Sequence, residues 1–511
     1  MITHWGLSNF KSFYAQTEVE LAPLTVLTGT NSSGKSSFIQ SMLLVAQTLR
    51  NPISSREIVI NGPLVEMGWY DEIKSIDRDE VSISFTSNFL DIKFSDGSVW
   101  YGNVIDDKIG FDKIKYTITF DSTWEQISSL KLECFKCFDA ITEYERFEKN
   151  GELIAKRTHV GKNLDIEKID GIFLDELNSR EQSNSASDKY DPQLIIDPHF
   201  LASNLKIRNS NLLVADGADG KYYPAVIPIQ ALLPLNKYLL RKFFGSFRYL
   251  GPLRFLDSIQ PFSTADDPKD VGISGKFTAA VLHSFFGAEV KYVEACNKDA
   301  QPTEMPVFFN TYKKCCLMEA LNYWLKYFDI GDGIELNRIR KGFELTVIPT
   351  DLNRKIEITH VGVGISQVLP VLVMCLLADR DSILVFEQPE LHLHPKVQSQ
   401  LADFFFSMAL TGRQCIIETH SEYFIDRLRL HISRFLLNNN ESLKKLTKIY
   451  YFKKGECGTK VMPIEIDEYA AYTEWPDGFF DERYNNSEEI RRAINKKILE
   501  EGDIDSELLD D

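Results

Sequence analysis

A glycine-rich stretch near the amino terminus limits what this chain can fold into more than any other feature. Gly29, Gly34, Lys35 and Ser36 match the pattern G-x-x-x-x-G-K-[ST]. The apolar run before them predicts a buried strand, and apolar residues at helical spacing after Ser36 predict a helix. A loop of this pattern between a strand and a helix is typical of a polyphosphate site. The stretch therefore predicts an α/β fold built around a phosphate-binding loop.

The chemistry of such a loop gives roles to its residues. Glycines allow the backbone to wrap around phosphates, while backbone N–H groups and the helix N-terminus supply positive potential. Lys35 is expected to reach the β- and γ-phosphates and Ser36 to hold Mg²⁺. We therefore predict ATP and Mg²⁺ as cofactors. The predicted nucleotide-binding residues are Gly29, Asn31, Ser32, Ser33, Gly34, Lys35, Ser36 and Ser37.

Two apolar segments in the second half of the chain predict further parts of the site. Residues 382–387 form a predicted buried strand that ends in the carboxylate of Glu387. Mg²⁺ between phosphates needs an anionic oxygen beside the loop, so Glu387 is a predicted metal residue. After a predicted helix over 395–410, residues 415–420 form another predicted strand, which ends at His420.

A glycine-rich segment before the apolar helix predicted over 368–378 has the features of an anion site. It contains Gly362, Gly364, Ser366 and Gln367. Glycines permit close approach, and a hydroxyl beside a helix N-terminus attracts an anion. Pro370 falls in the first turn of the predicted helix, where proline is tolerated. An ordinary turn before a core helix is the alternative.

Composition bears on partners and location. The net charge of −17 repels DNA over most of the surface, so DNA binding would need a local basic groove. The longest apolar stretch is too short to span a bilayer, and the first residues lack a secretion signal. Eight cysteines without a regular framework fit reduced thiols. We therefore predict a cytoplasmic protein without a membrane partner.

Three motifs resemble the RecF, SMC and OLD-like branch of the ABC-type AAA ATPases. They are Asn9-Phe-Lys-Ser-Phe13, the Pro-Glu-x-His-Leu-His-Pro of residues 389–395, and Thr419-His-Ser421. In this branch a long insertion splits the ATPase head, and more than half of this chain separates Lys35 from Glu387. The resemblance implies an α/β fold, an ABC-type P-loop ATPase head split by a long α+β insertion, with a small C-terminal extension. The insertion is predicted without a coiled coil because no sustained heptad pattern precedes residue 350.

The resemblance also implies roles for single residues. His420 would contact the γ-phosphate, and the segment with Gly362, Gly364, Ser366 and Gln367 would be the signature loop that completes the ATP site of the opposite subunit. A homodimer or a larger assembly with ATP at the interface follows. Lys11 and Ser12 would lie near the adenine and ribose, or would simply belong to an edge strand.

Gln388 occupies the position where these ATPases usually carry the glutamate that activates the attacking water. A neutral amide cannot accept a proton, and loss of a general base costs roughly 10²- to 10⁴-fold in rate. Either Glu390 serves as the base, or the protein hydrolyses ATP slowly and uses it as a clamp. The predicted catalytic residues are Glu390, Gln388 and His420.

We predict four segments along the chain. Residues 1–110 form the N-terminal half of the head with an antiparallel sheet, and residues 111–344 form the insertion, first β and then helical. Residues 345–460 form the C-terminal half of the head, with the signature loop, the Walker B strand (residues 382–387) and the switch histidine (His420). Residues 461–511 form a C-terminal extension with an acidic tail.

The end of the chain resembles a C-terminal domain of unknown function that caps bacterial ATPases, including those of Septu and PARIS anti-phage systems. The resemblance implies an ATPase that assembles with itself and holds or activates a separate effector, such as a nuclease. A RecF-like DNA-repair ATPase and a transporter subunit are the alternatives, the second disfavoured by the long insertion. Asp503 and Asp505 lie in a polar tail without a predicted strand, so no nuclease centre is predicted here.

Some residues with reactive side chains favour structural interpretations. His392 and His394 lack further ligands, which favours a structural or dimer-contact loop over a metal pair. Cys134 and Cys137 have ligand-like spacing without a second pair, which favours ordinary cysteines over zinc. Arg254 is expected to be solvated rather than to contact a phosphate or another subunit.

Overall fold

The computed structural model describes most of the two motif-bearing ends of the chain and individual strands between them. The described residues are 1–50, 58–75, 79–88, 92–93, 99–100, 113–120, 127–135, 140–149, 152–160, 193–195, 206–215, 222–228, 246–257, 259–262, 267–295, 312–349, 355–360, 362–437, 445–467, 471–473 and 488–495.

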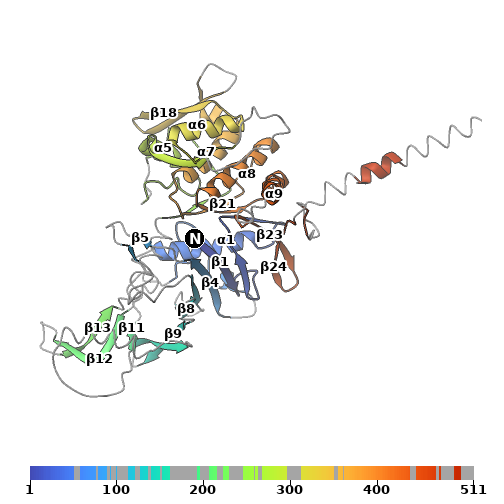
Figure 1. Ribbon diagram of the computed structural model, residues 1–511. Helices are drawn as coiled ribbons and strands as arrows, with labels where there is room; N and C mark the ends of the chain where they lie inside the picture. The colour runs from blue at the N-terminus through green and yellow to red at the C-terminus, as the bar shows by residue number, and fades with distance from the viewer. Residues whose placement is uncertain are drawn as a thin grey trace, which may run out of the picture.

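A six-stranded sheet forms the centre of the molecule (Figure 1). Its order is β14-β21-β22-β3-β23-β24, and every neighbouring pair is parallel except β23 with β24. The strands are β14 (Phe247–Leu250), β21 (Ile383–Glu387), β22 (Gln414–Glu418), β3 (Leu24–Gly29), β23 (Thr447–Gly455) and β24 (Gly458–Pro463). The sheet thus joins segments from both ends of the chain.

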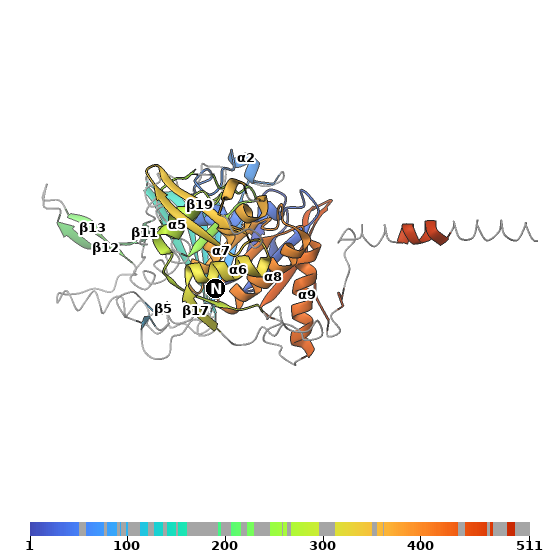
Figure 2. The same cartoon turned by 90° about the horizontal axis from the view of Figure 1, so that it is seen from above.

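Both faces of this sheet are covered, which explains why its central strands are continuous apolar runs. Leu384 and Phe386 of β21 pack into one core with five helices, whereas Ile383 and Val385 pack into a second core with α1. The helices of the first core are α5 (Thr278–Phe285), α6 (Leu317–Phe328), α7 (Val363–Leu377), α8 (Pro395–Leu410) and α9 (Glu422–Leu437). Figures 1 and 2 show α6, α7 and α8 gathered together, and Figure 1 shows α1 (Lys35–Arg50) across the sheet from them.

A second, antiparallel sheet packs on the outer side of α1. Its order is β13-β12-β11-β10-β9-β8-β7-β4-β1-β2. Trp5 of β1 lies in the core with α1 and donates its indole N–H to Ser41 Oγ at 2.9 Å. The strands are β1 (Ile2–Ser8), β2 (Thr17–Glu20), β4 (Val81–Asn88), β7 (Lys113–Phe120), β8 (Ile127–Phe135), β9 (Ala140–Lys149), β10 (Glu152–Val160), β11 (Gln193–Ile195), β12 (Lys206–Ala215) and β13 (Tyr222–Pro228).

Smaller elements complete the described structure. They are α2 (Tyr70–Ile73), β5 (Ile92–Lys93) with β6 (Val99–Trp100), β16 (Glu289–Val293) with β17 (Tyr312–Cys316), the 3₁₀ helix η3 (Ile358–His360), and a small sheet of β15 (Ile259–Gln260), β18 (Gly333–Ile339), β19 (Gly342–Ile348) and β20 (Ile356–Glu357). Residues 488–495 are also helical.

The predicted fold class is confirmed: one α/β head contains the phosphate loop and the Walker B strand, and the chain between them is long and mixed. Within the described residues the longest helices have 16 residues, so none forms a coiled-coil arm. β14 comes from within the segment 111–344 yet belongs to the sheet of the head.

One expectation about α7 is wrong. The helix begins at Val363 rather than near residue 368, so Pro370 lies inside it and not in its first turn. The glycine-rich segment itself supplies the N-cap, Gly362, and the first turn of the helix. Pro370 packs against Gly275, where a Cβ atom on residue 275 would clash with the proline ring.

Candidate nucleotide-binding site

The parallel arrangement of five strands gathers the predicted site residues at one edge of the sheet. Gly29 ends β3, Glu387 ends β21 and Glu418 ends β22. In register, Glu387 pairs with Glu418, and Glu418 pairs with Leu27 of β3. The carboxyl edge of a parallel sheet is where ligands bind in open α/β folds. The phosphate-loop and Walker B segments therefore meet at this edge.

The loop between β3 and α1 depends on two glycines. Gly29 has a φ of 140°, and a Cβ atom there would stand 2.1 Å from the carbonyl oxygen of Phe452 on β23. Gly34 has a φ of 103°, and a Cβ atom there would meet the hydroxyls of Thr459 and Ser12. A side chain at either position would be strained and would collide with its neighbours.

The rest of the loop is open to solvent on one side. Asn31, Ser32 and Ser36 are exposed, and Ser37 is half-buried. Ser33 is buried, and its carbonyl oxygen accepts a hydrogen bond from the Thr459 hydroxyl at 2.9 Å. The loop is thus anchored on β24 while its outer residues remain accessible to a ligand.

Lys35 lies folded over the loop. Its Nζ donates to the carbonyl oxygens of Gly29 at 3.1 Å and Thr30 at 2.7 Å. Burial lowers the pKa of Lys35, and the nearby carboxylate of Glu418 opposes this shift. The ammonium group therefore lies within the loop between β3 and α1.

Ser36 faces a carboxylate that the sequence analysis did not single out. Its Oγ donates toward the two side-chain oxygens of Glu418, at 3.2 and 3.3 Å. Burial, followed by the charge of Glu387, raises the pKa of Glu418 to about 7. The signal was present, because residues 414–418 are an apolar strand ending in an acid, as residues 383–387 are.

Glu387 is held by a tyrosine from the neighbouring strand. Its Oε1 accepts a hydrogen bond from the Tyr249 hydroxyl of β14 at 2.8 Å. Burial raises the pKa of Glu387, although Tyr249 and Arg254 act against the shift. Burial and the Glu387 charge in turn raise the pKa of Tyr249. This carboxylate is therefore positioned by β14, another contact that the sequence did not indicate.

Arg254 corrects an expectation, because it is 1% exposed rather than solvated. Its guanidinium donates to the carbonyl oxygens of Glu387 at 2.6 Å and Gln388 at 3.4 Å. Burial lowers the pKa of Arg254 to about 10, with Glu390, Tyr249 and Glu387 opposing. The arginine thus supports the turn after β21, where Gln388 has a φ of 44° and donates its backbone N–H to the Glu418 carbonyl oxygen.

Glu390 and His420 are in contact. The buried Glu390 accepts a hydrogen bond through Oε1 from the backbone N–H of His420 at 2.8 Å. Burial raises the pKa of Glu390, and this backbone hydrogen bond opposes the rise. The exposed His420 ring has a pKa lowered by partial burial and by Lys35. The predicted base and the predicted switch histidine therefore lie side by side at the same edge.

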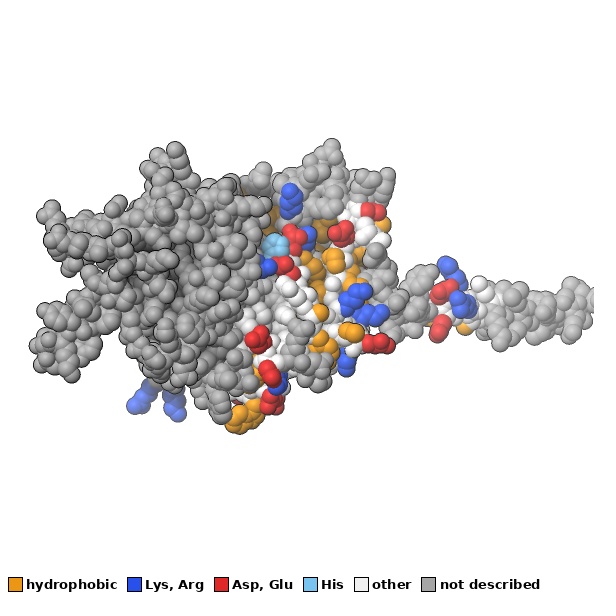
Figure 3. Space-filling view, turned by 90° about the horizontal axis from the view of Figure 1, so that it is seen from below, with side chains coloured by type: hydrophobic (Ala, Val, Ile, Leu, Met, Phe, Trp, Pro, Cys, Tyr) orange, Lys and Arg blue, Asp and Glu red, His pale blue; other side chains and the backbone are white. Residues whose placement is uncertain are grey.

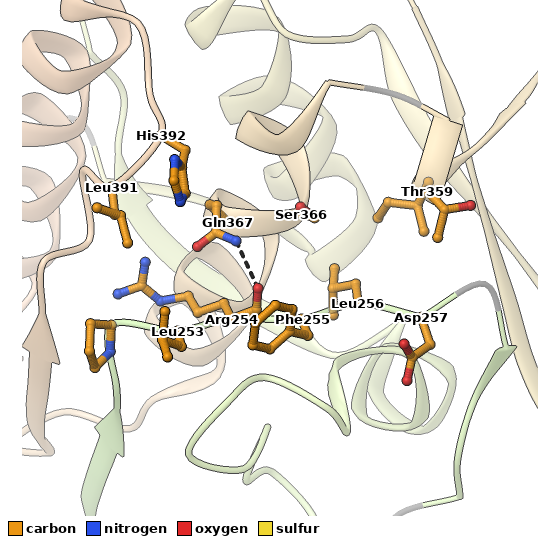
Figure 4. A pocket seen from close by; sticks show the side chains of 12 residues that line it. Leu253, Arg254, Phe255, Leu256, Asp257, Thr359, Ser366, Gln367, Leu391 and His392 are labelled. Carbon is orange, nitrogen blue, oxygen red and sulfur yellow. Dashed lines mark hydrogen bonds between the residues drawn. The ribbon is translucent and has the colours of Figure 1, made fainter.

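The predicted signature residues surround the start of α7. Gly362 is exposed and Ser366 half-buried, whereas Gln367 is buried. The Gln367 amide donates through Nε2 to the Arg254 carbonyl oxygen at 2.7 Å, as drawn in Figure 4. Gly364 packs against Leu393.

A cavity of about 310 Å³ lies beside this helix start, lined among others by Ser366, Gln367, Arg254 and His392. Figure 4 shows Arg254 and Gln367 next to one another in it, with His392 opposite. The cavity lies where the signature segment, the loop after β14 and the loop after β21 come together.

A profile match over most of the sequence identifies the family of the chain. The profile of the AAA ATPase domain matches residues 1–197 and 291–425, which is well over half of the chain. The chain belongs to the AAA ATPase domain family. A second profile, described as a protein of unknown function (DUF3696), matches residues 444–490 of this AAA ATPase. No curated protein matches the chain.

Solved structures resemble this AAA ATPase at low identity. The SMC head domain from Thermotoga maritima has a TM-score of 0.35 at 9% identity. The match covers 91% of this chain and 99% of the Thermotoga chain. The SMC head bound to the C-winged helix domain of ScpA has a TM-score of 0.39 at 12% identity, covering 91% and 98%. The Pyrococcus furiosus SMC head domain with an extended coiled coil, bound to the C-terminal domain of ScpA, has a TM-score of 0.37 at 10% identity. The match covers 96% of this chain and 99% of that chain.

The structure describes some of the other predicted features of this AAA ATPase and leaves the rest outside its described residues. His394 caps α8 by accepting from the Lys396 N–H at 3.3 Å, and no group of three potential metal ligands occurs among the described residues. Cys137, Asp503 and Asp505, together with the side chain of Cys134, lie outside what the structure describes. No helix in the described ranges is long and apolar enough to cross a membrane.

Lys11 and Ser12 lie near the loop but make protein contacts. Lys11 donates through Nζ to Gln40 Oε1 at 2.6 Å, and Ser12 accepts a hydrogen bond from Thr459 at 2.8 Å. Among the described residues that are coloured in Figure 3, acidic and basic side chains are interspersed with apolar ones. DNA binding stays an untested alternative.

Proposed function

We propose that this AAA ATPase binds Mg²⁺ and ATP at the carboxyl edge of the six-stranded sheet and hydrolyses the nucleotide slowly. The observation that carries the proposal is the placement of Lys35 and Ser36 beside Glu418, whose register partner on β21 is Glu387. Ser36 Oγ lies 3.2 Å from Glu418, a residue far away in the sequence. This contact supports a single site built from both halves of the chain.

The donor atoms at this edge fit Mg²⁺. They are the Ser36 hydroxyl and the carboxylates of Glu387 and Glu418, which are hard oxygen ligands of the kind that Mg²⁺ prefers. When bound, the ion would neutralise charge that develops on the phosphates. Lys35 would bind the β- and γ-phosphates, and the loop N–H groups would orient them.

Slow hydrolysis follows from Gln388. Its amide can orient a water molecule but cannot take a proton from it. The hydrolysis rate therefore lacks the roughly 10²- to 10⁴-fold acceleration that a general base supplies. Glu390 is an available carboxylate two residues further on, and its hydrogen bond to the His420 N–H supports a role in holding the switch histidine. We assign Glu390 the role of base only for the slow reaction that remains.

We also propose that two copies close around ATP, each using the start of its α7 as the signature loop of the other's site. Gly362 is exposed with open space around it, and the half-buried Ser366 lies in the first turn of a 15-residue helix. A helix N-terminus of this kind is suited to a phosphate of the opposite subunit.

The last part of the proposal concerns the biological role. The assembled dimer would hold or activate a separate effector, a nuclease in anti-phage defence. This part is supported by the resemblance of the C-terminal region to the domain that caps ATPases of such systems. Co-purification of the full chain with the products of neighbouring genes, with and without ATP, tests it.

The central claim is tested by equilibrium binding of a fluorescent ATP analogue. We expect Lys35→Ala to lower affinity at least tenfold, because the phosphates lose their main cationic partner. Lys314→Ala, which removes an exposed lysine of β17, serves as the matched control and should bind normally. Equal affinity of all three proteins would refute the proposed site.

A further inference from the structure

Glu418 is a buried carboxylate whose role the phosphate-loop motif does not specify. It ends β22, the strand that lies between β3 and β21, and it is 3% exposed. Its two side-chain oxygens lie 3.2 and 3.3 Å from Ser36 Oγ. β22 thus brings a second acid to the residue that the motif assigns to the metal.

The surroundings of Glu418 leave its charge poorly compensated. Its hydrogen-bonding side-chain partner is a neutral hydroxyl, and its register partner on β21 is a second carboxylate, Glu387. Lys35 attracts Glu418, but the lysine also donates to two backbone carbonyl oxygens of its own loop. A buried carboxylate in this position is costly unless a cation stands beside it.

The other two carboxylates are already engaged elsewhere. Glu387 accepts from Tyr249 at 2.8 Å, and Glu390 accepts from the His420 backbone at 2.8 Å. The first hydrogen bond comes from β14, on the far side of β21 from β3, and the second comes from the turn after β22. Glu418 is the carboxylate of the three that contacts Ser36.

We propose that Glu418 anchors the divalent cation beside Ser36, so that the metal site is built from the ends of both β21 and β22. The inference rests on the proposed function and adds to it: Glu387 alone does not form the anionic part of the site. The ligand class is a small, oxygen-preferring divalent cation bound together with a nucleotide.

The test compares nucleotide affinity with Mg²⁺ and with EDTA in the wild-type protein, Glu418→Gln and the control Glu422→Gln on the same segment. The first substitution keeps the shape of the side chain and removes its charge. We expect Mg²⁺ to tighten ATP binding in the wild type and the control. In Glu418→Gln this gain should fall roughly 10- to 100-fold, as for other residues that support a bound metal, while affinity in EDTA stays unchanged.

A direct measurement of the metal accompanies it. Mn²⁺ serves as the probe, and electron paramagnetic resonance counts the free ion in the presence of protein and ADP. Weaker Mn²⁺ binding by Glu418→Gln supports the inference. Unchanged Mn²⁺ affinity together with an unchanged Mg²⁺ gain overturns it and leaves the proposed function intact. If the wild type binds no nucleotide in either buffer, it is the proposed function that fails.

Glu418→Asp guards against loss of folding. It keeps the charge but withdraws the carboxylate from Ser36 by one methylene. Circular dichroism establishes that each variant is folded. The inference fails if folded Glu418→Asp and Glu418→Gln proteins both bind Mn²⁺ with wild-type affinity. Weaker Mn²⁺ binding in either variant supports it.

Discussion

At the scale of single residues, the turn after β21 carries Gln388, on which the proposed slow hydrolysis depends. Gln388 has a φ of 44°, and its backbone is held by Glu418 through the N–H and by Arg254 through the carbonyl oxygen. These contacts involve only main-chain atoms of Gln388. Its side chain can therefore be exchanged without dismantling the turn.

Gln388→Glu should accelerate ATP turnover by roughly 10²-fold or more, because a carboxylate can accept the proton of the attacking water. The measurement is steady-state phosphate release at saturating ATP. Gln388→Ala, which adds no base, is the control and should not accelerate. A Gln388→Glu rate equal to that of the wild type would show that Glu390 or another group already supplies full base catalysis.

The same region shows what residue types alone could predict. The motif indicated that Lys35 and Ser36 lie at the start of a helix that follows a buried strand, and they begin α1 after β3, because spacing in a phosphate loop reflects local backbone chemistry. The expectation that Arg254 is solvated was wrong. Nothing in Tyr249-Leu-Gly-Pro-Leu-Arg254 indicates that the guanidinium of Arg254 donates hydrogen bonds to two carbonyl oxygens that are distant in the sequence.

At the scale of elements, α8 is joined to α6 and α9 by a buried polar cluster. Asp403 of α8 is fully buried and accepts from Arg427 Nε at 2.7 Å, from Tyr327 at 2.6 Å and pairs with His431 at 2.6 Å. Burial alone would raise the pKa of Asp403, but His431 and Arg427 lower it. One carboxylate thus connects three helices that cover the sheet.

Asp403→Ala should destabilise the protein by roughly 3–5 kcal/mol, because it leaves buried donors without their acceptor. Urea unfolding measures the change. Asp379→Asn, at an exposed pair with Lys269, is the control and should cost less than about 1 kcal/mol. A loss of similar size in both variants would contradict the role given to the cluster.

The pH dependence of the same variant has a definite sign. The folded pKa of Asp403 is below its ordinary value, so its ionised form stabilises the protein at neutral pH. This contribution is lost as pH falls through the range below the unfolded pKa of about 3.9. The difference in unfolding free energy between wild type and Asp403→Ala should therefore shrink on acidification.

At the scale of the whole molecule, the proposed dimer depends on the start of α7 remaining available. Ser366→Arg should abolish ATP-induced dimerisation, because a bulky cation would fill the cavity beside the helix start. Sedimentation velocity with and without ATP measures the change in mass. ATP binding by the monomer should be retained, since the phosphate loop lies elsewhere.

Ser433→Arg on α9 adds the same charge on another helix and should leave dimerisation unchanged. Because each copy has a net charge of −17, association should also strengthen as salt rises from very low ionic strength. A wild-type protein that stays monomeric with ATP at every salt concentration would rule out the dimer.

The sequence alone predicted the phosphate loop and the apolar strands at 24–28, 382–387 and 415–420, because these features depend on local spacing and on apolar runs, and the family resemblance implied that they form one split ATPase head. Only the tertiary structure decided that β22 lies between β3 and β21, that Glu418 faces Ser36, and that Tyr249 and Arg254 hold the Walker B turn. Those contacts depend on strand order, and strand order is set by packing across the entire sheet rather than by any segment of it.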